Sequence, residues 1–73
     1  MTPRSVKSRF GIRLRQLREE RGYSQEELAE RAGLHRNYVG GVERGERNVA
    51  LENIVKLAKA LSVPPRDLFG DFS

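Results

Sequence analysis

Residues 24–45 read SQEELAERAGLHRNYVGGVERG, and this stretch decides the fold. Ser24 is followed three residues later by Glu27, which is the spacing of a capping box at a helix N-terminus. Gly33 and Gly45 are each expected to end a helix, because glycine readily adopts the left-handed conformation of a C-cap. The stretch therefore predicts two short helices joined by a tight turn.

The expected helices cover residues 25–32 and 36–44, with a turn over 33–35. This spacing is that of a helix-turn-helix unit, although many helix hairpins of this kind have no DNA partner. At 100° per residue, the second helix carries one outward face without an acidic residue. Ordinary surface polarity would also give such a face, but two helix-weakening glycines favour close approach to another surface. The face consists of Arg36, Asn37, Gly40, Gly41 and Arg44, opposite Tyr38, Val39 and Val42.

The rest of the chain is also helical in its periodicity, and no stretch alternates long enough to predict a strand. We expect one compact all-α domain of five helices over 1–73, with its core at about 6–70. The apolar stripe of the first helix is Phe10, Leu14 and Leu17; that of the fourth is Leu51, Ile54, Val55, Ala58 and Leu61; and a short fifth helix begins at Pro65 and runs through Asp67, Leu68 and Phe69.

The composition excludes several classes of protein. The chain of 73 residues has no cysteine and one histidine, so neither a disulfide nor a zinc site is expected. We also expect no enzyme and no cofactor, because His35 is solitary and no glycine-rich phosphate loop follows a strand. The first ten residues contain no apolar run, which indicates neither a signal peptide nor a membrane span and favours the cytoplasm.

The charge is uneven along the chain. Residues 1–48 hold eleven lysines and arginines against seven acidic residues, which accounts for the whole net charge of +4. Such an excess favours a polyanionic partner, although solubility alone would also explain it.

Residues 10–69 resemble the Cro/C1-type helix-turn-helix transcriptional regulators, also called the xenobiotic-response-element family. The resemblance is carried by LRQLREERG, SQEELAERAGL, YVGGVERG and LENIVKLAKAL, and the run HRNYVGGVERGERN is particularly similar to restriction–modification controller proteins. It implies a lambda-repressor-like DNA-binding domain, with 24–44 as the helix-turn-helix unit. The expected function is sequence-specific regulation of transcription at operator sites in double-stranded DNA. The alternative is an antitoxin-like or other protein-interaction module of the same fold.

The resemblance also implies roles for single residues. Arg36 and Asn37 would contact bases, and the DNA backbone would be contacted by Gln25, Tyr38, Arg44, Arg47 and Asn48. His35 would be either a helix cap or a phosphate ligand. Arg18 and Glu43 would form an internal ion pair that orients the second helix of the unit. Gly41 stands where other members carry a long polar side chain that reads a base. Recognition of the operator would therefore depend more on the shape and deformability of the DNA.

Members of this family usually act as homodimers that place two helices in major grooves about 34–36 Å apart. The tail at about 63–73 is the expected dimerisation segment, although Leu68 and Phe69 would alternatively only complete the monomer core. RNA polymerase is a further candidate partner, whereas neither a membrane nor a small-molecule effector is expected. The protein would be of bacterial or phage type and associated with the nucleoid. The interface residues would be Val63, Leu68, Phe69 and Phe72.

Overall fold

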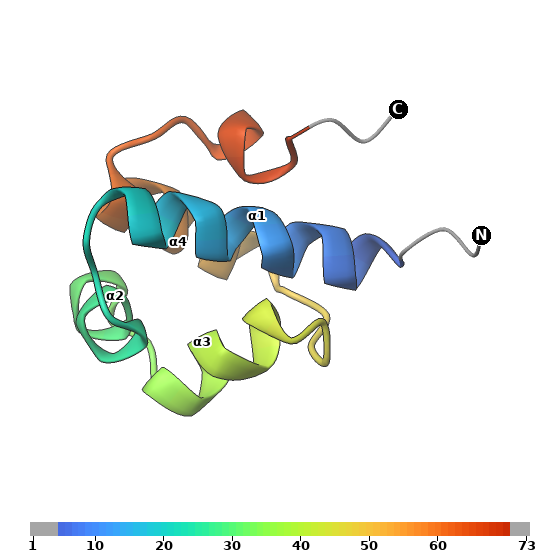
Figure 1. Ribbon diagram of the computed structural model, residues 1–73, viewed down its shortest axis with the longest axis horizontal. Helices are drawn as coiled ribbons and strands as arrows, with labels where there is room; N and C mark the ends of the chain where they lie inside the picture. The colour runs from blue at the N-terminus through green and yellow to red at the C-terminus, as the bar shows by residue number, and fades with distance from the viewer. Residues whose placement is uncertain (1–4, 71–73) are drawn as a thin grey trace.

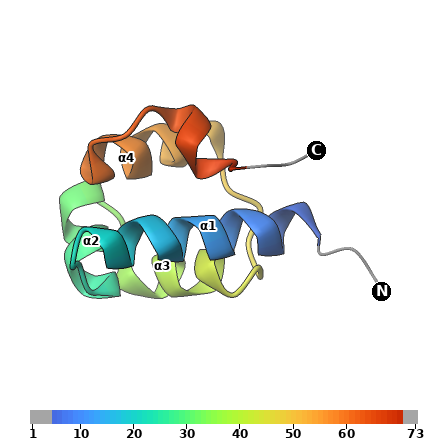
Figure 2. The same ribbon diagram turned by 45° about the horizontal axis from the view of Figure 1, so that its top comes forward.

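The computed structural model describes residues 5–70, which form four α-helices and one short 3-10 helix (Figure 1). In Figure 1, α2 and α3 lie below α1 and η1 lies above it, and Figure 2 shows α4 and η1 together on the upper side. The described part contains no strand, as the periodicity predicted. The helices are α1 (Val6–Glu20), α2 (Gln25–Ala32), α3 (Arg36–Glu43), α4 (Leu51–Leu61) and η1 (Pro65–Leu68).

The expected fifth α-helix is wrong, because residues 65–68 form a single 3-10 turn. Pro65 suits the first turn of a helix, but Gly70 adopts a positive φ of 58° two residues beyond the end of the segment. The segment between these two residues is too short for a second helical turn. The described residues therefore contain four α-helices.

The two helices of the predicted unit have the caps that the sequence indicated. The Ser24 hydroxyl accepts a hydrogen bond from the Glu27 backbone N–H at 3.0 Å, and Gly33 is left-handed with φ 70°. His35 caps α3, since its Nδ1 accepts the Asn37 N–H at 3.1 Å. Because Arg44 is the C-cap, α3 is one residue shorter than expected.

The core is aliphatic apart from Phe10, with contributions from all five elements. Its composition differs from the expectation in α4, where Leu57 is fully buried and Leu51 is 75% exposed. Leu57 lies three residues after Ile54 and four before Leu61, so helical spacing supports the observed stripe equally well. No helix in residues 5–70 is long and apolar enough to cross a membrane.

Gly11 determines how closely α3 lies to α1. It is buried in the middle of α1, where a Cβ would lie 2.3 Å from the Val42 carbonyl oxygen and 2.6 Å from that of Glu43. Backbone atoms at the end of α3 thus pack directly on the backbone of α1. This contact offsets the cost of a glycine inside a helix, which is about 1 kcal/mol relative to alanine; no pattern within α1 predicts it.

Candidate nucleic-acid interface

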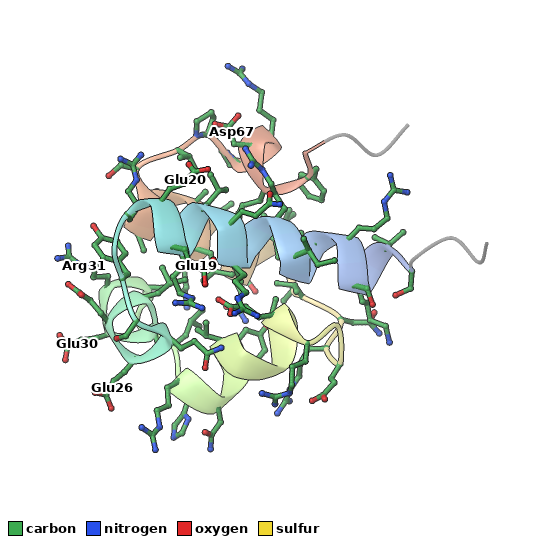
Figure 3. All side chains as sticks on the ribbon, viewed as in Figure 1. Glu19, Glu20, Glu26, Glu30, Arg31 and Asp67 are labelled. Carbon is green, nitrogen blue, oxygen red and sulfur yellow. The ribbon has the colours of Figure 1, made fainter. Side chains whose placement is uncertain are left out.

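An open groove of about 570 Å³ lies between the first turn of α2 and the outward face of α3. It brings together four of the eight residues predicted to contact DNA, together with the Arg18 side chain. Figure 3 shows Glu26 projecting from α2 at the lower edge of the molecule, on the side where α3 lies. The lining residues are Arg18, Ser24, Gln25, Glu26, Arg36, Asn37, Gly40 and Arg44.

The polar side chains of the outward face of α3 are exposed, as the helical wheel predicted. Arg36 lies 3.4 Å from the Glu26 carboxylate, measured from Nη1 to Oε2, and Arg44 Nε lies 3.1 Å from Glu46 Oε2. Both outward arginines are therefore paired with carboxylates from outside α3. The wheel of one helix could not reveal Glu26, because α2 and α3 meet only in the folded chain.

The two glycines of this face are buried, and their role in close approach to another surface stays a prediction. A Cβ on Gly40 would lie 3.1 Å from Arg44 Nη1 and 3.3 Å from the Gln25 side-chain oxygen. A Cβ on Gly41 would lie 3.1 Å from Arg47 Cγ. Flexible side chains of the protein itself cover both positions.

Arg18 and Glu43 form a two-pronged ion pair behind the groove. Arg18 Nε donates to Glu43 Oε2 at 2.6 Å, and Arg18 Nη2 donates to Oε1 at 3.0 Å. The two side chains are only 11% and 4% exposed. Hydrogen bonding to the Glu43 carboxylate, which outweighs the cost of burial, raises the pKa of Arg18 above its ordinary value. Arg18 therefore stays charged at any pH at which the protein would be studied.

The ion pair belongs to a larger polar network. Arg18 Nη1 donates to the Tyr23 carbonyl at 2.8 Å, and Gln25 Nε2 donates to Glu43 Oε1 at 3.0 Å. The network joins α1, the start of α2 and the last residue of α3. Gln25, expected at a DNA phosphate, lies at the groove with its amide turned to Glu43.

Tyr38 of α3 lies beside Arg47, which Asn48 follows in the loop after α3. The Arg47 guanidinium lies 5.6 Å from the centre of the Tyr38 ring, and Asn48 is exposed. The Tyr38 hydroxyl accepts a hydrogen bond from Asn53 Nδ2 at 3.1 Å. Asn53 was not among the predicted site residues, and no local pattern in α4 points to it.

The residues predicted for a dimer interface have different environments. Leu68 is fully buried and contributes to the core of its own chain, so its side chain is not available to a second copy. Val63 packs against the core and is partly buried, whereas Phe69 is 38% exposed and contacts Phe10 edge-to-face at 5.6 Å. Phe72 lies outside the described residues.

Comparison with known proteins identifies relatives that this chain matches over most of their length. The Helix-turn-helix family model matches residues 14–68. Control protein C.BamHI of Bacillus amyloliquefaciens is 47% identical over 70 residues, which cover 94% of this chain and 85% of that protein. Control protein C.SmaI of Serratia marcescens is 51% identical over 61 residues, covering 81% and 73% respectively.

A solved structure agrees in fold as well as in sequence. The crystal structure of the restriction-modification controller protein C.AhdI from Aeromonas hydrophila matches with a TM-score of 0.84 and 61% identity, covering 85% of this chain and 94% of that one. The family is one of DNA-binding regulators and not of enzymes, in agreement with the expectation from sequence. The chain therefore belongs to the helix-turn-helix family of DNA-binding transcriptional regulators and resembles the controller proteins among its members.

Proposed function

We propose that this protein is a controller-like regulator of a restriction–modification system that binds operator DNA through the outward face of α3. This proposal rests on the exposed side chains of Arg36, Asn37 and Arg44, which lie beside the groove shared with α2. Arginine donates bidentately to guanine and asparagine pairs with adenine in the major groove, so Arg36 and Asn37 would read bases. The regulator would act in the cytoplasm, on the nucleoid.

The residues around this face would hold the DNA backbone. Arg44, Arg47 and Asn48 are exposed and would pair with phosphates, with Tyr38 beside them. Gln25 is the first residue of α2, where the helix dipole and unpaired N–H groups favour an anion. His35 would serve as the cap of α3, since its Nδ1 already accepts a backbone N–H.

We further propose that the chain binds as a homodimer in which a second copy covers Val6, Phe10 and Phe69 at the N-terminal end of α1 and leaves Arg47 and Asn48 open to DNA. An apolar groove of about 240 Å³ lies there, and Phe69 at its edge is 38% exposed. A dimer would double the operator contact, and RNA polymerase would be its partner at an activated promoter. The whole chain would act as one domain, with 63–73 contributing to the interface. The groove is lined by Val6, Lys7, Phe10, Arg47, Asn48, Val49, Ile54 and Phe69.

Selection of bound sequences from a random duplex pool tests this function with the full chain. We expect enrichment of a site with two-fold symmetry and half-sites about one helical turn apart. Affinity for the selected site should fall about 10³-fold or more between 50 and 200 mM salt, because several phosphate contacts release counterions. Failure to enrich any sequence would contradict DNA recognition and favour a protein-interaction module.

The dimer has its own test. Val6→Glu would place a charge at the edge of the apolar groove, at a residue that is exposed in the single chain. Sedimentation equilibrium should then give the mass of one chain for the variant and of two chains for the wild type. A wild type that sediments as one chain would contradict the dimer without affecting the role of α3.

A further inference from the structure

Asn53 lies in the first turn of α4, outside the helix-turn-helix unit, yet it contacts the DNA-facing helix. Its side-chain nitrogen lies 3.1 Å from the Tyr38 hydroxyl, and both residues are partly buried. The bond joins residues 15 positions apart in the chain and links α4 to α3. It fixes the position of a phenol at the rim of the proposed DNA-binding face.

The direction of this hydrogen bond determines what the phenol can still do. An amide NH₂ group only donates, whereas a tyrosine hydroxyl both donates and accepts. With Asn53 as the donor, the oxygen of Tyr38 is the acceptor and its own proton stays available. The hydroxyl is therefore held as a donor for another group.

Arg47 indicates what that other group would be. Its guanidinium lies 5.6 Å from the centre of the Tyr38 ring and is exposed. A phosphate that pairs with Arg47 would be brought close to the Tyr38 ring. A hydroxyl donor beside a cation suits an anionic phosphate oxygen, since hydrogen bonds to charged groups are stronger than neutral ones.

We propose that Asn53 is a positioning residue that holds the Tyr38 hydroxyl as a proton donor to a DNA phosphate, without touching DNA itself. This inference rests on the proposed function, because it requires that α3 faces DNA. It makes a residue of α4 part of the determinants of operator affinity.

A double-mutant cycle on the full chain tests this inference, with the selected operator duplex as the probe. Asn53→Asp keeps the size of the side chain but leaves only acceptors, so the Tyr38 proton would turn inward. Both Asn53→Asp and Tyr38→Phe should weaken operator binding about tenfold, the loss expected for a hydrogen bond to a charged group. The operator affinity of the double variant should be at most about twofold lower than that of Tyr38→Phe, because the hydroxyl is already absent.

The Tyr38→Phe background also controls for the new negative charge, which repels phosphate whether or not the hydroxyl is present. Fully multiplicative losses in the double variant would overturn the inference. If Asn53→Asp is unfolded at the assay temperature, Asn53→Ala replaces it in the same cycle, with a smaller loss that should again vanish beside Tyr38→Phe. A wild type that binds no duplex would instead contradict the proposed function.

Discussion

Two of the ion pairs between an arginine and a glutamate at α3 differ most in burial. Arg18 and Glu43, at its C-terminal end, are 11% and 4% exposed and are joined by two bonds of 2.6 and 3.0 Å. Arg36 and Glu26, at its N-terminal end, are 64% and 75% exposed and meet at 3.4 Å. The same two residue types therefore form a fixed part of the structure at one end and an exchangeable contact at the other.

Burial explains the difference. A buried charge that loses its partner is stranded in a medium of low dielectric constant, whereas exposed pairs contribute about 0–1 kcal/mol because water and salt screen them. A DNA base or phosphate can therefore replace Glu26 at Arg36 at little cost, but nothing can replace Glu43 at Arg18. The comparison predicts stability effects at one end of α3 and binding effects at the other.

The largest effect is expected for Glu43→Ala. It removes the carboxylate that pairs with Arg18 and accepts from Gln25, so the free energy of unfolding should fall by about 3–5 kcal/mol. Urea or thermal unfolding measures the loss, and operator binding should fall with it. Glu26→Ala is the matched control, with a change within about 0.5 kcal/mol. An unchanged melting temperature for Glu43→Ala would refute the structural role of the pair.

The second prediction concerns removal of both buried charges. Arg18→Met combined with Glu43→Leu should recover most of the stability lost in Glu43→Ala, because no charge is then left stranded. Chemical denaturation of the single and double variants gives the comparison. A double variant as unstable as the sum of the two single variants would show that the pair is not the source of the loss.

At the exposed end, Arg36→Ala should affect binding alone. The loss of a bidentate base contact costs about 1–3 kcal/mol, or roughly 5- to 150-fold in affinity for the selected operator. The melting temperature should stay within the range of ordinary surface substitutions. Affinity measured by fluorescence anisotropy beside a thermal melt separates the two quantities, and unchanged operator affinity would contradict the base contact.

The smallest effect is expected for Glu26→Gln. Removing the carboxylate frees Arg36 for any phosphate, so affinity for unrelated duplex DNA should rise, by less than about fivefold. The effect should be visible at low salt and fade as salt rises, since both partners are exposed. Equal or weaker binding to unrelated DNA would show that Glu26 does not compete with phosphates.

The sequence predicted the features that depend on residues close together in the chain. The limits of α2 follow from Ser24 and Gly33, which cap the helix whatever else the chain does. The Arg18–Glu43 pair was expected only from resemblance to known regulators, because 25 residues separate its partners.

Features that depend on packing between helices were missed. Glu26 and Asn53 owe their roles to neighbours distant in the chain, and no periodicity within one helix distinguishes them, whereas Leu57 does fit the helical spacing of Ile54 and Leu61. The excess of arginine also does not distinguish arginines that bind a partner from arginines that stabilise the fold. Arg13 Nε and Arg21 Nε donate at 2.8 Å to the backbone carbonyls of Asp67 and Leu61, so part of the basic character stabilises turns of the protein itself.

The close approach at Gly11 has a consequence for altering base preference. One contact that seats α3 on α1 is made by main-chain carbonyls and by a position without a side chain, and the other by the Arg18–Glu43 ion pair; neither involves Arg36 or Asn37. Exchanging Arg36 and Asn37 for other residues would leave that seat unchanged. New recognition residues could therefore be grafted onto this helix without redesigning its support, provided that position 11 stays glycine.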